Sequence, residues 1–247
     1  MEEERKYIGG QKDLLDNKKS AVRKYRDLFI GDTSFLYFLK YELIITLFSN
    51  IPGALGFVLR KIFFKKLFKK IGNGVVFGRN MMIRHPQKIK IGNNVVFDDN
   101  SVIDAKGENN NGITLGNNVL IGRGTTISCK GGDIEIGNYT NIGPLNTIIS
   151  ESKIVIGEYV FTAGHLYMIA GGNHTFERKD IPIWKQPSIS KGGIIIEDDV
   201  WIGASATILD GVKIRTGSII GAATLVHRKM PAYSVAIGNP AQIIKKR

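Results

Sequence analysis

Bulky apolar residues recur every six positions over most of the chain from Ile71 onward. The longest run contains Ile196, Ile202, Ile208, Ile214, Ile220 and Val226. Shorter runs with the same step are Ile71, Phe77, Ile83 and Ile89; Ile91, Phe97 and Ile103; Leu115, Ile121 and Ile127; and Ile136, Ile142 and Ile148. A period of six fits neither a helix nor an alternating strand. Self-similarity at a fixed period is typical of a solenoid.

The repeat predicts short strands joined by tight turns. Three six-residue units would make one triangular coil, with the apolar residue pointing inward and stacked on its equivalents in neighbouring coils. Glycine commonly follows the apolar residue, as in IGNN, IGRG and WIGA. We interpret these glycines as corners that need unusual backbone angles. Because coils would pair in parallel and satisfy each other's backbone groups, the pattern predicts an all-β solenoid, a parallel β-helix.

Residues 1–70 have a different pattern, which predicts α-helices. Their second half is rich in Leu, Phe and Ile, but Lys40, Glu42 and Pro52–Gly53 interrupt it before it reaches the length of a membrane-spanning helix. We therefore expect two domains, a helical N-terminal cap over 1–70 and a β-helix over 71–247. Two compatible interpretations of the cap stay open. It covers the open end of the β-helix, or residues 35–70 lie on an anionic membrane surface.

Net charge narrows the choice of partners. The chain carries a formal charge of +12, and residues 1–70 hold 15 Lys and Arg against 8 Asp and Glu. No recognition helix, zinc finger or aromatic RNA-binding strand is evident, so nucleic acid is the least favoured polyanion. A single cysteine, Cys129, and the lack of an apolar leader favour a cytoplasmic protein. With the basic cap, we expect peripheral contact with the inner face of the membrane.

The six-residue repeat stops at one long insertion, which we place at 163–193. It contains the stretch AGGNHTFERKDIPIWKQ, whose polar composition predicts a projecting loop rather than core. His174 lies in this loop. A histidine is suited to moving protons near neutral pH.

Three motifs carry a resemblance to a known family. They are GGNHTFERKDIPIWKQ at 171–186, IIIEDDVWIGASATILDGVKI at 194–214, and the ending PAYSVAIGNPAQIIKKR. Residues 71–247 resemble the left-handed β-helix hexapeptide-repeat acyltransferases, above all the maltose and galactoside O-acetyltransferases and the O-acetyltransferases of polysaccharide biosynthesis. The resemblance implies a left-handed coil, against the usual handedness. It also implies a homotrimer with active sites at subunit boundaries and acetyl-CoA as co-substrate.

The resemblance makes His174 the catalytic general base. Asn173 and Glu177 are both candidates for orienting it. Among the other histidines, His165 is the alternative base, while His85 and His227 are interpreted as turn and surface residues. We expect no metal site, because the chain lacks closely spaced histidines.

Further positions follow from the same motifs. Trp201 would flank the pantetheine channel, beside small residues that let the arm lie on the backbone, and the amide of Ala204 would bind the oxyanion. The predicted CoA-binding residues are Trp201, Gly203, Ala204, Gly221, Ala222, Arg228, Lys245 and Arg247. The predicted acceptor-binding residues are Asn173, Glu177, Arg178, Trp184 and Gln186.

The function expected from these features is transfer of acetyl from acetyl-CoA to a sugar hydroxyl, in surface polysaccharide or glycan biosynthesis. Alternatives that the sequence leaves open are N-acetylation of an amino-sugar nucleotide and O-acetylation of serine or an antibiotic. A non-catalytic β-helix scaffold is a further alternative, which predicts no binding of acetyl-CoA.

Overall fold

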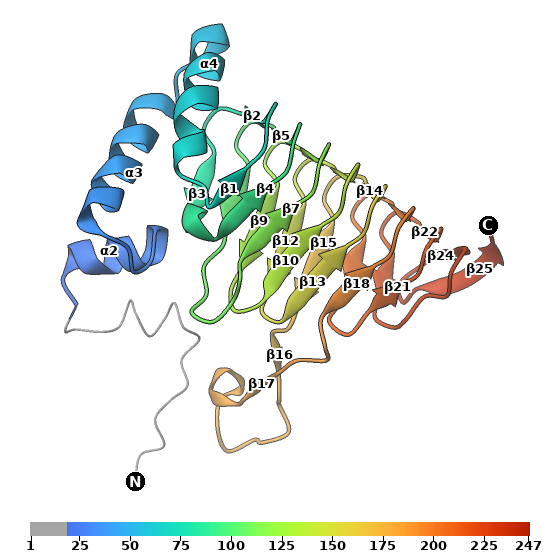
Figure 1. The fold of residues 1–247 in the computed structure, drawn as a ribbon. Coiled ribbons are helices and arrows are strands. Elements are labelled where there is room, and N and C mark those ends of the chain that lie inside the picture. The colour runs from blue at the N-terminus through green and yellow to red at the C-terminus, as the bar shows by residue number, and fades with distance from the viewer. Residues whose placement is uncertain (1–18) are drawn as a thin grey trace.

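A computed structural model describes residues 19–247. The first 18 residues of the predicted cap lie outside the described residues. Figure 1 shows a solenoid with helices at its N-terminal end, the C-terminus at the opposite end, and one loop that projects from the side.

The solenoid has three sheets that run along its length. The first contains β1 (Lys70–Ile71), β4 (Ile89–Ile91), β7 (Ile113–Leu115), β10 (Asp133–Ile136), β13 (Lys153–Ile156), β18 (Ile194–Ile196) and β21 (Lys213–Ile214). The second contains β2 (Val76–Phe77), β5 (Val96–Phe97), β8 (Leu120–Ile121), β11 (Asn141–Ile142), β14 (Phe161–Thr162), β19 (Trp201–Ile202), β22 (Ile219–Ile220), β24 (Ser234–Ile237) and β25 (Gln242–Lys246). The third contains β3 (Met82–Arg84), β6 (Val102–Asp104), β9 (Thr126–Cys129), β12 (Thr147–Ser150), β15 (Tyr167–Ala170), β20 (Thr207–Ile208) and β23 (Leu225–Val226).

Strands within each sheet pair in parallel, apart from β25, which closes the C-terminal end antiparallel to β24. The chain visits the three sheets in turn, so each turn of the chain makes one coil. This is the predicted parallel β-solenoid, and it matches a left-handed β-helix.

The repeating apolar residues point into the solenoid, as the six-residue period predicts. Ile196, Ile202 and Ile208 are all buried, each on a different sheet. Equivalent residues in neighbouring coils stack on one another, as the rings of Phe77 and Phe97 do with 5.7 Å between their centroids. The core is therefore a set of apolar columns along the solenoid axis.

The glycines that follow the apolar residues have a different role from the predicted one. Positive φ falls two positions later, on residues such as Asn94 (φ 54°), whereas Gly92 has no such angle. A Cβ on Gly92 would lie 2.4 Å from the carbonyl oxygen of Gly116 in the next coil. The glycine is needed because neighbouring coils approach too closely for a side chain, and asparagine adopts the left-handed angle.

Within residues 19–247, three α-helices and short 3₁₀ turns complete the fold: α2 (Ala21–Phe29), α3 (Phe35–Phe48), α4 (Gly53–Phe63), η1 (Phe64–Lys66), η2 (Pro86–Lys88) and η3 (Ile183–Lys185). The Ser20 and Ser34 hydroxyls cap α2 and α3 by accepting from backbone amides one turn later. Among the described residues, no helix is long and apolar enough to cross a membrane.

The helices pack on the first coil of the solenoid. Phe64 is fully buried with its ring 5.5 Å from that of Phe77, and the Tyr41 hydroxyl donates to the carbonyl of Ile83 at 2.6 Å. Because these contacts cover the first aromatic and aliphatic columns, the helices seal the N-terminal end of the core.

The insertion expected at 163–193 begins later in the structure. Strands β14 and β15 continue the sheets as far as Ala170, so the projecting loop consists of residues 171–193. The repeat is hard to see there because Thr162 takes an inward position held elsewhere by an aliphatic residue. Its buried hydroxyl is satisfied by the Asn146 side-chain amide at 2.8 Å, which makes a polar residue tolerable inside the core.

Candidate functional site

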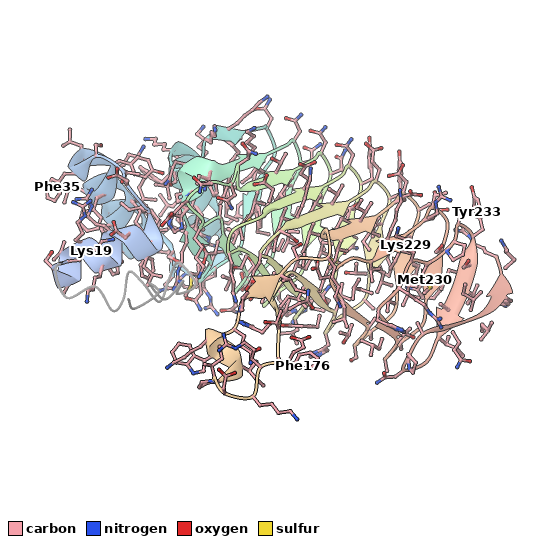
Figure 2. The ribbon with its side chains drawn as sticks, turned by 90° about the horizontal axis from the view of Figure 1, so that it is seen from below. Lys19, Phe35, Phe176, Lys229, Met230 and Tyr233 are labelled. Atoms are coloured by element: carbon pink, nitrogen blue, oxygen red, sulfur yellow. The ribbon has the colours of Figure 1, made fainter. Side chains whose placement is uncertain are left out.

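The projecting loop, residues 171–193, is a hairpin with a short helical turn at its tip. Strand β16 (Asn173–His174) pairs antiparallel with β17 (Ser188–Ile189), and η3 lies between them. Figure 2 shows Phe176 on the part of this loop that stands away from the solenoid. The loop leaves the third sheet after β15 and returns to the first sheet at β18, so it lies at the corner between those sheets.

Asp210 fastens the two ends of the projecting loop. Its buried carboxylate accepts from the Asn173 side-chain amide at 2.9 Å on the outgoing strand. It also accepts from the backbone amides of Lys191 at 2.5 Å and Gly193 at 2.8 Å on the returning segment. These charge-assisted bonds set the base of the hairpin that carries His174.

His174 is half-buried, and its ring is held by the backbone of the same loop. Its Nδ1 lies 3.2 Å from the carbonyl oxygen of Gln186. A carbonyl can only accept, so Nδ1 carries the proton in the neutral ring and Nε2 keeps a free lone pair. The imidazole is thereby presented as a proton acceptor at Nε2.

Asn173 and Glu177, the two residues predicted to orient His174, form their side-chain hydrogen bonds with other partners. The Asn173 side chain binds Asp210, and the Glu177 carboxylate accepts from the Phe176 amide at 3.0 Å. The orienting group is the backbone carbonyl of Gln186. A sequence gives no direct signal for a contact made by a main-chain atom twelve residues away.

Gln186 is placed inside the loop rather than on its surface. Its side chain is buried, and its amide nitrogen donates to the carbonyl of Arg178 at 2.7 Å. Its amide oxygen accepts from the Arg178 backbone amide at 3.4 Å. The residue therefore organises the tip of the loop, which in turn positions the carbonyl that holds His174.

The remaining predicted acceptor-binding residues are exposed on the loop. Trp184 is exposed with the Lys185 ammonium 5.4 Å from its ring centroid. Arg178 forms an ion pair with Asp180 at 2.5 Å. An exposed indole and an exposed guanidinium on the same loop are suited to contact a polar ring such as a sugar.

The other three histidines do not lie in the projecting loop. His165 is exposed at a corner with φ 61°, and His227 is exposed after β23. His85 is a buried turn residue, with Nε2 3.1 Å from the Asp27 carbonyl and Nδ1 3.4 Å from the Asp104 carboxylate. Among the described residues, no group of three His, Cys, Asp or Glu side chains is arranged to hold a metal ion.

Trp201 lies on the second sheet, in register with Phe161 and Ile219. It is half exposed and lines a shallow hollow of about 180 Å³ together with Tyr159 and Arg247. Arg247 forms an ion pair with Asp199 at 2.7 Å across this hollow. The aromatic surface is suited to an extended, partly apolar chain.

Small residues follow Trp201 at the corner between the second and third sheets. Close packing alone explains why position 203 is a glycine, because a Cβ on Gly203 would lie 2.5 Å from the Ala222 amide nitrogen. Ala204 and Ala222 are exposed in adjacent coils, and the Ala223 amide donates to the Ala204 carbonyl at 2.8 Å. Gly221 is likewise restricted by Ile237 of the last coil.

The predicted basic residues do not form one cluster. Arg228 follows the third sheet and donates to the carbonyl of Ala241 at 3.3 Å. Lys245 belongs to β25, the last strand of the second sheet, and Arg247 follows it.

A separate basic hollow of about 390 Å³ was not anticipated from the sequence. It is lined by Lys213, Arg215, Lys229, Met230 and Pro231. Figure 2 shows Lys229 and Met230 on the C-terminal part of the solenoid. The hydrogen bond from Lys213 lowers the pKa of the nearby Glu197 carboxyl, so Glu197 offsets part of the positive charge. The sequence signal is that Lys213 and Lys229 fall at the same place in successive coils, beside the paired residues Ile214 and Met230.

One chain does not bring the two halves of the predicted site together. His174 projects from the corner between the third and first sheets, whereas Trp201, Gly203 and Gly221 lie on or just after the second sheet. His174 and the predicted CoA-binding surface therefore lie on different sides of the same solenoid.

Residues 193–228 match the bacterial transferase hexapeptide (six repeats) family. Over this stretch, the chain is similar to that family. A probable acetyltransferase of Mycobacterium tuberculosis is 33% identical over 135 residues, which cover 55% of this chain and 44% of that protein. The chain spans about half the length of the curated relatives it matches first.

Two solved structures share the hexapeptide-repeat fold. The polySia specific acetyltransferase NeuO is 26% identical with a TM-score of 0.54, over 72% of this chain and 81% of that one. A mutant of AntD, an N-acyltransferase from Bacillus cereus in complex with dTDP-4-amino-4,6-dideoxyglucose and Coenzyme A, is 24% identical with a TM-score of 0.51. That match covers 74% of this chain and 87% of the AntD chain.

Proposed function

We propose that the protein is an acetyl-CoA-dependent acetyltransferase in which His174 is the general base. The observation that carries the proposal is the bond from Nδ1 to the Gln186 carbonyl, which leaves Nε2 free to accept a proton on a loop exposed to solvent. The similarity to acetyltransferases supports acyl transfer as the reaction.

The proposed step is direct attack. Nε2 of His174 takes the proton of the acceptor hydroxyl as its oxygen bonds to the thioester carbonyl carbon. The amide of Ala204, supplied by a neighbouring copy of the chain, donates to the oxyanion of the tetrahedral intermediate. The carbon–sulfur bond then breaks, and the imidazolium returns its proton to the leaving thiolate. No covalent enzyme intermediate forms.

We propose a sugar hydroxyl as the acceptor, in a polysaccharide or glycan. The exposed Trp184, Glu177 and Arg178 on the loop support a polar acceptor, and NeuO is a polySia specific acetyltransferase. N-acetylation of an amino sugar is the alternative, since AntD shows that the same fold also carries N-acyl transfer.

We also propose that the active unit is a homotrimer. The proposed base and the Trp201 surface lie on different sides of one chain. A neighbouring copy is therefore needed to supply the Trp201 surface that faces the loop. We place this assembly in the cytoplasm, beside the membrane.

The proposal is tested by release of free CoA from acetyl-CoA with a panel of acceptors. Neutral sugars and oligosaccharides offer hydroxyls alone, whereas amino sugars and amino-sugar nucleotides offer an amine as well. We expect acceptor-dependent release of CoA with hydroxyl-only acceptors, and mass spectrometry should place the acetyl group on oxygen. Transfer to amines alone would support the N-acetyl alternative, and no binding of acetyl-CoA would support a scaffold.

A further inference from the structure

Helix α3 exposes a stripe of leucines. Leu36, Leu39, Leu43 and Leu47 have 79%, 48%, 60% and 50% of their surface exposed. Their spacing of three and four residues places them along one side of the helix. The opposite side buries Tyr41 and Ile44 against the solenoid. A surface helix of a soluble protein normally carries polar residues on its outer side, whereas α3 exposes this stripe of leucines there.

Helix α4 repeats the arrangement. Leu55, Val58 and Ile62 are 66%, 48% and 43% exposed and follow the same spacing. Phe48 of α3 and Phe63 of α4 stack with 4.1 Å between ring centroids, which joins the two helices. Both helices lie at the N-terminal end of the solenoid (Figure 1), and Figure 2 shows Phe35 at the outer edge of that end. We call the exposed apolar residues of α3 and α4 the cap face.

Positive charge is concentrated in the segment that contains the cap face. Residues 35–70 contain seven Lys and Arg and one acidic residue, a net charge of +6 out of +12 for the chain. The one acid, Glu42, accepts a hydrogen bond from the Tyr25 hydroxyl at 2.9 Å. The side chains of Lys61, Lys65 and Lys69 are exposed, next to Ile62 and the end of α4.

We propose that the cap face docks on the surface of an anionic lipid bilayer. The leucines would enter the boundary between headgroups and acyl chains while the lysines contact lipid phosphates. An anionic bilayer supplies both an apolar layer for the leucines and negative charge for the lysines. A second copy of the cap would supply apolar area but would oppose six net positive charges with six more, which disfavours self-association.

The test is co-flotation of the full-length protein with vesicles of phosphatidylcholine alone or with added phosphatidylglycerol. We expect binding to the anionic vesicles that weakens as salt rises, with little binding to phosphatidylcholine. The double variant Leu39→Ser with Leu43→Ser should weaken binding at least tenfold, because it loses at least the free energy of burying one leucine side chain. Lys61→Gln with Lys65→Gln should weaken it by roughly fivefold for each lysine.

Matched controls separate docking from folding and from catalysis. Leu145 is 50% exposed at a corner of the solenoid, so Leu145→Ser should leave vesicle binding unchanged. Thermal unfolding shows whether each variant is folded, and acetyl transfer to a water-soluble acceptor should stay at the wild-type level. Folded cap-face variants that bind vesicles as well as wild type would overturn the proposal. Failure of the wild type to bind anionic vesicles at low salt would also overturn it, as would lipid-free self-association abolished by the leucine variants.

Discussion

At the scale of single residues, the candidate base depends on a main-chain contact. His174 is held through Nδ1 by the carbonyl of Gln186, and Gln186 is fixed because its own side chain is buried and bonded to Arg178. The orientation of the imidazole is thus set by how the loop folds and not by a bond to an acidic side chain. This arrangement fixes the tautomer without adding a charge beside the ring.

Gly203 has two interpretations, close packing of adjacent coils and contact with CoA, and a measurement of protein stability distinguishes them. Because its added Cβ would lie 2.5 Å from the Ala222 amide nitrogen, Gly203→Ala should force adjacent coils apart and lower Tm by several degrees, for a cost of about 1–3 kcal/mol. The measurement is thermal unfolding without any CoA.

Ala204→Gly is the control for Gly203, because Ala204 is exposed at the same corner. Its Tm should stay close to that of the wild type, within the loss expected for an added glycine. A Gly203→Ala protein that is as stable as the wild type would show that glycine at this position serves ligand contact instead of packing.

At the scale of elements, two excursions interrupt the same corner of the solenoid in related ways. Residues 105–112 lie between β6 and β7, and Asp133 accepts from the Asn111 and Gly112 backbone amides at 2.6 and 2.9 Å. Asp210 makes the corresponding bonds to the projecting loop. The first excursion carries no histidine, so the two aspartates offer a matched comparison.

Asp210→Ala should reduce kcat by about tenfold to a hundredfold, because a displacement of about 1 Å in a catalytic group has effects of this size. The KM for acetyl-CoA should change little, since Asp210 lies at the base of the loop and not on the Trp201 surface. Steady-state kinetics with a saturating acceptor provide the measurement.

Asp133→Ala is the control for this prediction. Asp133→Ala should lower Tm about as much as Asp210→Ala does, while leaving kcat close to that of the wild type. Equal losses of kcat in the two variants would assign Asp210 a role in overall stability alone.

The sequence predicted the elements wherever one inward residue was enough to define them. The columns of Ile196, Ile202 and Ile208 follow directly from the period of six. The start of the loop was misplaced because Thr162 stands at an inward position, and a buried polar residue is readable only when its partner, Asn146, is known. The Gln186 carbonyl was missed because a main-chain contact within the loop leaves no side-chain pattern in the sequence, and the Lys213–Lys229 hollow was missed because it depends on how neighbouring coils pair.

At the scale of the whole molecule, three surfaces are separated along and around one solenoid. The cap face lies at the N-terminal end, the projecting loop leaves one corner, and Trp201 lies on the second sheet. This separation is the reason for proposing a trimer. If the cap faces of its subunits lie at one end, docking on a membrane leaves the loops free at the sides.

The whole account depends most directly on His174 as the base. The deciding measurement is the rate of acetyl transfer by His174→Ala beside wild type, with His165→Ala as the control because His165 is an exposed corner histidine. We predict a fall in kcat of about a hundredfold or more for His174→Ala, with the KM for acetyl-CoA retained and His165→Ala at the wild-type rate. Transfer by folded His174→Ala at the wild-type rate would contradict the account.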